Sequence, residues 1–405
     1  MKVTWPKKFL AALVFLGLSI YSCNQATDKS AEATNGDGVL LPNGTVFTRA
    51  SLLTAWGECI VSEVENFEEQ SRAFAATAAA SITDPSEQDS VKQAWKRTID
   101  AWQELEVMQV SPAAMSTQPG GQGWREAIYA WPVHTHCPLD RNLVSEAYTT
   151  NPTEVKFTEN GLWATEYLLF YSGGDNTCAL DDEINSSGSW NALDDDTLSL
   201  RRARYASFTA KTVATAAAGL LNAWAPTGEN FLAELAQAGD GSRTYRKKRV
   251  AINAVSDALF YVEGITKDRK LARPLGIIDC EQEYCTELVE SKYGRRSKEH
   301  LRNNLLGFRK LFTGCGKDNE GLGFDDLLFA MGHTDLAEEI NQAALATLDA
   351  IDAIDAADLV TALEEDRQGV LEVHNALSEL TDLLRSEFLA ALSLEIPQMV
   401  QGDND

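Results

Sequence analysis

The segment ENGLWATEYLLF, residues 159–170, places one carboxylate, Glu166, in the middle of a run of large apolar side chains. On a helix, Glu166 shares a face with Leu162 and Leu169, and aromatic side chains cover the neighbouring face. A helix that is apolar nearly all round lies inside a protein. A carboxylate in that setting must meet a cation, several hydrogen-bond donors or a metal ion, or else keep its proton. Glu166 is therefore the first candidate for a functional residue.

The densest polar cluster in the chain is WPVHTHCPLDR, residues 131–141. His134 and His136 are two residues apart, a spacing that lets both imidazoles reach one iron or zinc ion from an irregular loop. Glu166 would then be a further ligand, and the neighbouring cysteine and aspartate add others. The alternative interpretation is a solvent-exposed loop whose cysteine forms a disulfide.

Arginine is the residue best suited to neutralise Glu166, because its planar guanidinium can hydrogen-bond both oxygens of a buried carboxylate. Arg141 is the first candidate, and it is also expected to form a charge pair with the adjacent Asp140. Arg125 is the second candidate. We therefore expect Glu166 to be charge-paired with one of these two arginines.

The elements that position these residues are predicted to be helices. Trp95, Ile99 and Trp102 recur at spacings of four and three, and the same pattern returns over 301–312 and 373–388. No comparable segment alternates with period two. Two regions rich in Gly, Pro and Ser flank the helix of Glu166, where loops held by a rigid scaffold often carry function. The fold class is therefore predicted to be all-α.

The N-terminus has the features of a secretory leader. Three lysines precede the apolar run FLAALVFLGLSI, which is too short for a membrane span of about 20 residues. Ile20, Ser22 and Cys23 resemble a bacterial lipobox, in which the cysteine is lipidated and becomes the mature N-terminus. We expect a signal peptide over 1–22, with ordinary signal cleavage as the alternative, and a flexible polar tether over 23–45.

The roughly 380 residues that remain exceed the usual size of one core, so two domains are expected. The segment APTGEN at 225–230 is a plausible boundary, although a kink within one domain would also explain it. The predicted division is a first helical bundle over 46–225, a second over 226–397 and a C-terminal tail over 398–405.

Charge and motifs exclude several function classes. The formal net charge is −25, and it becomes −28 once the leader is removed, because the leader holds three lysines and no acid. Such a balance repels nucleic acid, which is not expected as a partner. The sequence contains no Gly-x-Ser-x-Gly, no phosphate-binding glycine loop and no His-Glu-x-x-His.

Besides Cys23, the chain has an even number of cysteines, which in an exported protein are expected to form disulfides. They are Cys59, Cys137, Cys178, Cys280, Cys285 and Cys315. Six cysteines allow 15 connectivities, and the sequence does not choose among them. The working hypothesis pairs Cys280 with Cys285, which bracket EQEY. It also pairs Cys137 with Cys178, and Cys59 with Cys315.

Five segments resemble the imelysin-like family in their order and rough spacing. They are AWKRTIDAWQELE, IYAWPVHTHCPLDRNLV, NGLWATEYLLF, KLARPLG and SKEHLRNNLLGFRKLFTG. Members of that family are exported bacterial proteins, first described as insulin-cleaving metallopeptidases. The resemblance covers nearly the whole mature chain. It implies two four-helix-bundle-like halves packed together, a functional cleft near a Gly-x-His-x-x-Glu motif and, for several members, a link to iron uptake.

Gly161 and Glu166 match that motif, but Trp163 occupies the position of its histidine. Tryptophan cannot ligate a metal, because its indole nitrogen carries a proton and has no available lone pair. Glu166 is thus predicted to be a polar anchor of an internal cleft. The other residues expected to line this cleft are Gly161, Trp163, Trp131, Asp140, Arg141 and Arg125.

The favoured function is an exported, lipid-anchored binding protein whose cleft takes a small ligand, a metal or a protein partner. Asn24 follows Cys23, which favours the outer membrane over retention elsewhere in the periplasm. The link to iron acquisition is implied by the resemblance alone. One alternative is a metal-dependent peptidase that uses Glu166 as base or ligand, with His134 and His136 replacing the lost histidine. A second alternative is a structural or adhesion protein without a small-molecule site.

Overall fold

The computed structural model of the chain describes residues 36–114, 118, 120–132 and 135–401. The predicted signal peptide, Cys23 and His134 lie outside the described residues. Helices account for most of the described chain, and its strands form a single two-stranded sheet. This confirms the predicted all-α class. No helix within the described ranges has both the length and the apolar character needed to cross a bilayer.

The first half contains α2 (Arg49–Ser81), α3 (Gln88–Glu106), α4 (Trp124–Ile128), α5 (Cys137–Ser145), α6 (Ala147–Thr150), α7 (Gly161–Phe170), α8 (Glu183–Ser186) and α9 (Asp195–Trp224). The second half contains α10 (Phe231–Ala236), α11 (Lys248–Leu259), α12 (Ser297–Phe312), α13 (Phe324–Ala330), α14 (Thr334–Ala353), α15 (Leu359–Glu365), α16 (Arg367–Leu383) and α17 (Leu389–Leu392). Two π-helices, η5 (Val262–Ala272) and η8 (Leu384–Phe388), also belong to it. Short 3-10 turns are η1 (Pro85–Glu87), η2 (Ser111–Ala113), η3 (Pro152–Glu154), η4 (Phe157–Glu159), η6 (Thr286–Leu288), η7 (Lys317–Asn319) and η9 (Gln398–Val400).

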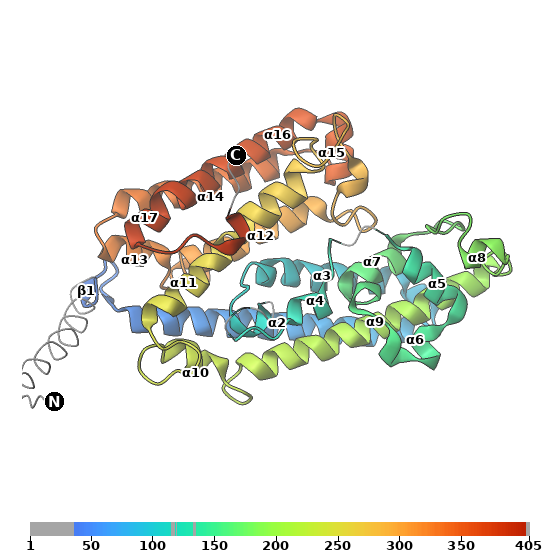
Figure 1. Cartoon of the computed structure of the whole chain (residues 1–405), viewed down its shortest axis with the longest axis horizontal. Helices are drawn as coiled ribbons and strands as arrows, with labels where there is room; N and C mark the ends of the chain where they lie inside the picture. The colour runs from blue at the N-terminus through green and yellow to red at the C-terminus, as the bar shows by residue number, and fades with distance from the viewer. Residues whose placement is uncertain (1–35, 115–117, 119, 133–134, 402–405) are drawn as a thin grey trace, which may run out of the picture.

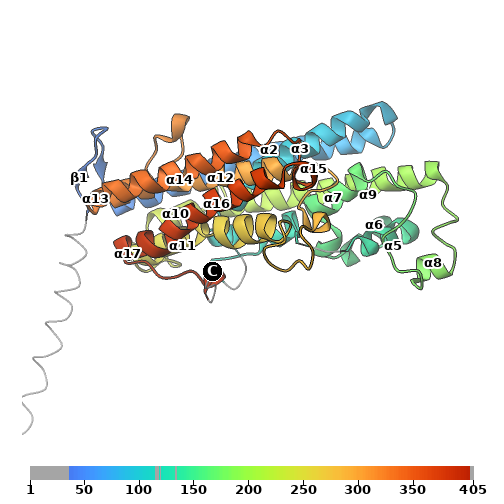
Figure 2. The same ribbon diagram turned by 90° about the horizontal axis from the view of Figure 1, so that it is seen from above.

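In the first half, the long helices α2 and α9 lie side by side and carry α3 and α7 on their flanks (Figures 1 and 2). Small side chains of α9, including Ala206, Ala210 and Ala217, are buried and let its backbone approach α2 closely. The periodic tryptophans Trp95 and Trp102 of α3 are fully buried, as their spacing predicts. Helix α10 follows the predicted boundary at 225–230 in sequence but packs on α2 of the first half. Because this contact crosses the boundary, the division into two bundles at that point stays a prediction.

The second half packs α14 against α16 and α12 against α14, with η5 lying on both α12 and α16. Figure 1 shows these helices above α2, α3 and α9. The halves meet where α12 packs on α3. A Cβ atom at Gly307 of α12 would lie 2.2 Å from the Glu104 carbonyl oxygen of α3. Glycine is therefore needed for this close approach between the halves.

A β-hairpin precedes the first described helix. Strands β1 (Val39–Leu40) and β2 (Val46–Phe47) pair antiparallel, and the adjacent Leu41 and the last residue of β2 are buried. The hairpin packs on α13. The flexible tether predicted over 23–45 is therefore wrong for its last residues. Leu41 is buried, although the neighbouring Leu40 is 64% exposed. Strand pairing and the contact of β2 with a distant helix fix this segment, which the local composition did not indicate.

Three disulfides form among the six described cysteines, with the connectivity of the working hypothesis. The pairs and their Cα–Cα distances are Cys59–Cys315 at 5.5 Å, Cys137–Cys178 at 4.6 Å and Cys280–Cys285 at 6.2 Å. The first of these joins α2 to the segment after α12 and so links the two halves covalently. Each of the two long-range bridges is expected to stabilise the fold by roughly 2–4 kcal/mol.

Candidate functional site

A cavity of about 310 Å³ lies between the two halves. The first half contributes α7 and the segment between α4 and α5, and the second half contributes η5 and the chain from 287 to 293. The lining residues are Trp131, Pro132, His136, Trp163, Glu166, Arg269, Arg273, Glu287, Leu288, Val289, Ser291, Lys292 and Tyr293. We call this cavity the inter-half pocket. It brings together four predicted site residues, namely Trp131, His136, Trp163 and Glu166.

Glu166 is only 3% exposed and is held by backbone amides. Its Oε1 accepts hydrogen bonds from the N–H groups of Tyr293, at 3.0 Å, and Gly294, at 2.9 Å. Burial raises the pKa of Glu166, and these amides together with His300 oppose the shift. No described arginine forms a hydrogen bond or ion pair with Glu166, so the predicted arginine partner is wrong. Two N–H groups supplied by a tight turn satisfy the oxygen instead.

The two candidate arginines pair with other carboxylates. Arg141 is exposed and forms an ion pair with Asp182, in the loop after α7. Asp140 is fully buried and accepts hydrogen bonds from the Tyr167 hydroxyl, at 2.9 Å, and the Thr177 amide, at 2.7 Å. Because successive helical residues point about 100° apart, these neighbours on α5 face opposite environments. The predicted pairing of Asp140 with Arg141 is therefore wrong, and neither residue lines the inter-half pocket.

Arg125 on α4 lies behind the pocket wall rather than in it. Its Nη2 donates to Glu106 Oε1 at 3.1 Å and to the Trp131 carbonyl oxygen at 2.8 Å. The Glu106 side chain is completely buried, and a buried carboxylate needs a cation nearby, which Arg125 supplies. Arg125 thus supports Trp131, a wall residue, instead of neutralising Glu166.

The His136 ring is stacked against aromatic side chains. Its ring stacks on Trp163 at 4.5 Å and on Tyr167 at 4.4 Å between ring centres. Burial and the nearby Lys292 lower the pKa of His136 to about 3, so the imidazole is neutral at pH 7. Trp163, which replaces the histidine of the family motif, therefore contributes an aromatic surface to the pocket.

Gly161, the other motif position, lies outside the pocket lining and has a structural role at the start of α7. Its φ angle is +78°, and an added Cβ would lie 2.6 Å from the Ile128 carbonyl oxygen. Only glycine lets α7 begin so close to the end of α4.

The described donors do not fit iron or zinc. Within the described ranges, the one group of three candidate ligands that converges is Cys137, Cys178 and Asp182, but its two cysteines form a disulfide and offer no thiolate. In the pocket, the two backbone amides already occupy Glu166 Oε1, and His136 is stacked between aromatic rings. A transition-metal site requires several free donors at about 2.0–2.3 Å from one point. The described residues offer no such set of donors.

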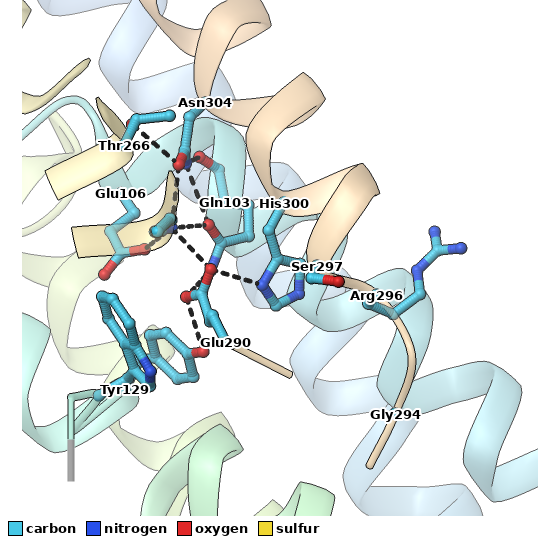
Figure 3. Close-up of polar contacts among 12 residues, drawn as sticks. Gln103, Glu106, Tyr129, Thr266, Glu290, Gly294, Arg296, Ser297, His300 and Asn304 are labelled. Carbon is cyan, nitrogen blue, oxygen red and sulfur yellow. Dashed lines mark hydrogen bonds and ion pairs between the residues drawn. The ribbon is translucent and has the colours of Figure 1, made fainter. Parts of the chain in front are cut away.

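A buried ionic network adjoins the pocket and is centred on Lys270 of η5, which is 1% exposed. Its Nζ donates to Gln103 Oε1 at 2.6 Å and Asn304 Oδ1 at 2.9 Å. It also pairs with Glu290 Oε2 at 3.1 Å and Glu106 Oε2 at 3.6 Å. Figure 3 shows the side chains from α3, α12 and the segment before α12 converging on one point. A single ammonium group therefore ties the two halves together.

Glu290 is the most constrained carboxylate of this network. It accepts a hydrogen bond from the Tyr129 hydroxyl at 2.8 Å, and its Oε2 lies 3.0 Å from His300 Nδ1 (Figure 3). Burial alone would raise the pKa of Glu290, but Lys270 and His300 hold it at about 2. Sequence reasoning missed Glu290 and Lys270. The available signal was that KLARPLG, which begins with Lys270, is one of the family-like segments.

The π-helix η5 directs consecutive residues to different places. Lys270 points into the ionic network, whereas Arg269 and Arg273 line the inter-half pocket. Arg273 pairs with Asp279 at 2.6 Å. Burial lowers the pKa of Arg269, and the neighbouring Arg273 and Arg125 lower it further. Wider π-helical turns are frequent at functional sites, and here η5 places Arg269 in the pocket lining, with Arg273 directly after the helix.

The fold and the pocket define a class of all-helical proteins with a ligand-sized cavity between two bundles. A sequence profile of the family described as imelysin matches residues 60–386. The chain therefore belongs to the imelysin family, which confirms the resemblance seen in its motifs. No curated protein sequence matches the chain.

Two crystal structures share the fold at low sequence identity. One is an imelysin-like protein from Psychrobacter arcticum 273-4, with a TM-score of 0.61, 15% identity, and coverage of 86% of this chain and 96% of that chain. The other, from Parabacteroides distasonis ATCC 8503, is described as a "putative iron-regulated protein A precursor". It has a TM-score of 0.62 and 14% identity, and the alignment covers 84% of this chain and 95% of that chain. At such identities the likeness shows the fold alone.

Proposed function

We propose that the chain is an exported, lipid-anchored binding protein that holds a small ligand in the inter-half pocket and serves iron acquisition. The observation that carries the proposal is the state of Glu166. Its Oε1 already accepts hydrogen bonds from two backbone amides. Trp163, which is stacked on His136, occupies the histidine position of the family motif. The cavity of about 310 Å³ has the size and the mixed aromatic and polar lining of a small-molecule site.

The same observation makes the peptidase alternative less favourable. A metallopeptidase needs a metal with an open coordination position and a base that can take a proton from its water. Glu166 is turned toward a backbone turn, and the amides of Tyr293 and Gly294 already donate to its Oε1. The described pocket residues supply only one imidazole, that of His136, and it is stacked between two rings. This arrangement suits the binding of an aromatic or apolar surface.

Two further observations support the cellular part of the proposal. The leader and the Ile20–Ser22–Cys23 pattern favour export and lipidation. The described chain begins at the β-hairpin, which lies at one end of the long axis of the molecule (Figure 1). A lipid anchor would thus hold the protein by one end. The role in iron acquisition rests on the family resemblance and on the structural neighbour from Parabacteroides distasonis, which is described as an iron-regulated protein.

The test compares metal content and hydrolysis in the full chain and two matched variants. Glu166→Gln changes the pocket, whereas Glu58→Gln changes an exposed residue of α2. We expect no stoichiometric zinc or iron by elemental analysis and no chelator-sensitive hydrolysis of insulin or peptides in any of the three proteins. One zinc or iron per chain, with hydrolysis abolished by a chelator and by Glu166→Gln but not by Glu58→Gln, would establish the peptidase instead.

Ligand binding is tested separately by native mass spectrometry of the chain purified from iron-limited cells. We expect a non-covalent small-molecule adduct that is lost in Trp131→Ala, because this indole forms a wall of the pocket. An adduct that persists in Trp131→Ala would place the ligand elsewhere.

A further inference from the structure

The inter-half pocket gathers positive charge in a strongly acidic protein. Arg269 of η5, Arg273 directly after η5, and Lys292 from the chain that follows η6 line it. The formal net charge of the whole chain is −25. Charges more than about 8–10 Å away are largely screened at physiological ionic strength. A ligand in the pocket therefore experiences these three cations more strongly than the distant acidic surface.

Two of the three cations lack an ionic partner. Within the part of the chain that the structure describes, Arg269 makes no hydrogen bond or ion pair, and Lys292 makes no ion pair. Lys292 Nζ lies 3.5 Å from the Glu287 carbonyl oxygen and 5.3 Å from the centre of the Tyr293 ring. Arg273 is paired with Asp279, which is 63% exposed, and such surface pairs contribute little. Two cationic groups are thus free to bind an anion.

The carboxylates that line the pocket leave this charge largely uncompensated. Glu166 is satisfied by the amides of the turn at 293–294, and burial favours its neutral form by raising its pKa. Glu287, the other lining carboxylate, is exposed and forms no ion pair among the described residues. Neither carboxylate neutralises Arg269 or Lys292 directly.

The remaining walls are flat and aromatic. Trp163 and the neutral His136 stack in near-parallel planes, with 14° between their rings, and Trp131 lies in the same lining. Pro132, Leu288 and Val289 complete the apolar surface. Aromatic faces favour stacking with a flat ligand, and guanidinium groups favour a carboxylate.

We propose that the inter-half pocket selects an organic anion with a flat apolar body, whose carboxylate binds Arg269 and Lys292 and whose body lies against the indoles of Trp131 and Trp163. The inference rests on the proposed function as a small-ligand binding protein and names the ligand class. It assigns Arg269 as the residue that sets specificity for negative charge.

The experiment is isothermal titration calorimetry of the full chain at pH 7.5 with two probes, 2-naphthoate and its neutral amide, 2-naphthamide. The probes share the flat body and differ in charge. We expect 2-naphthoate to bind at least tenfold more tightly than 2-naphthamide, and added NaCl to weaken only the binding of the carboxylate. Arg269→Gln should remove at least tenfold of the 2-naphthoate affinity and leave 2-naphthamide binding unchanged.

The matched control is Arg97→Gln, because Arg97 is exposed on α3 and does not line the pocket. It should bind both probes like the unmodified chain. Trp163→Leu should weaken both probes, which locates them in the pocket. Equal affinity for the two probes, or an unchanged 2-naphthoate affinity in Arg269→Gln, would overturn the anion inference and leave the binding function standing. Failure of both probes to bind at about 10 mM would also overturn the anion inference. The proposed function is tested separately, by the metal analysis and the hydrolysis assay described above.

Discussion

Removing the ammonium group at the centre of the buried network should be strongly destabilising, and Lys270→Met is the variant that isolates this effect. Methionine is unbranched, lacks only the terminal ammonium atom and has a similar volume, so the change in packing is small. What is lost is the positive charge 3.1 Å from Glu290 Oε2 and 3.6 Å from Glu106 Oε2. Gln103 Oε1 and Asn304 Oδ1 also lose one donor each, although Asn304 Nδ2 still donates to the first and Thr266 Oγ1 to the second.

Most of the expected loss in the free energy of unfolding comes from Glu290, which is left without a lysine partner. Glu106 keeps the cation Arg125 as a partner at 3.1 Å. Glu290 keeps Tyr129, His300 and a long hydrogen bond of 3.5 Å from Gln103 Nε2. Breaking a buried ion pair from one side costs about 3–5 kcal/mol, because an uncompensated charge remains. With an unfolding entropy of roughly 2 cal/mol/K per residue, this loss lowers Tm by roughly 4–6 °C in a chain of this length.

The assay is thermal and urea unfolding of the full chain at pH 7 with its disulfides intact. Lys211→Met, an exposed lysine of α9, is the matched control and should lie within about 0.5 kcal/mol of the unmodified protein. The double variant Lys270→Met/Glu290→Gln should be more stable than Lys270→Met alone, because it no longer buries an unpaired carboxylate.

The pH dependence gives a second, independent test. Lys270 and His300 hold the pKa of Glu290 at about 2, below its ordinary 4.5, so its stabilisation is present above pH 4.5 and is lost as the pH falls toward 2. In Lys270→Met burial dominates and should raise this pKa. The penalty is then present at pH 7 and disappears as Glu290 becomes protonated at lower pH. The stability difference between the two proteins should narrow from pH 7 to pH 4. A loss below about 1 kcal/mol at pH 7, or a difference that does not change with pH, would refute this reasoning.

Three other predictions concern separate parts of the chain. Glu166→Ala should cost about 2–4 kcal/mol in urea unfolding because it leaves the amides of Tyr293 and Gly294 without an acceptor. Glu166→Gln should cost less because its carbonyl oxygen can accept from both amides, and equal losses would contradict this geometry. Gly161→Ala should lower stability by at least about 1 kcal/mol through the contact with Ile128, and an unchanged Tm would argue against it. Mass spectrometry of the native N-terminus should find an acylated Cys23, and any other mature N-terminus would remove the lipid anchor.

The helices and their buried faces could be predicted from the sequence. Leu301, Leu305 and Phe308 recur at helical spacing, and all three are buried on α12. Such periodicity is a local property of the chain, because a helix presents residues three and four apart to the same side. The burial of Glu166 was predictable for the same reason, since its segment has no polar face. The even number of cysteines likewise indicated disulfides, although not their pairing.

The partners of the buried charges were decided only by the tertiary structure. Glu166 meets amides of the turn at 293–294, more than a hundred residues away, and the backbone of that turn carries no side-chain signal. Arg125 and Arg141 lie closer in sequence, but helix orientation turns one toward Glu106 and the other toward solvent. The Lys270 network depends on three elements meeting at one point. Helical periodicity determines which face of an element is buried, whereas the packing of distant elements determines what that face contacts.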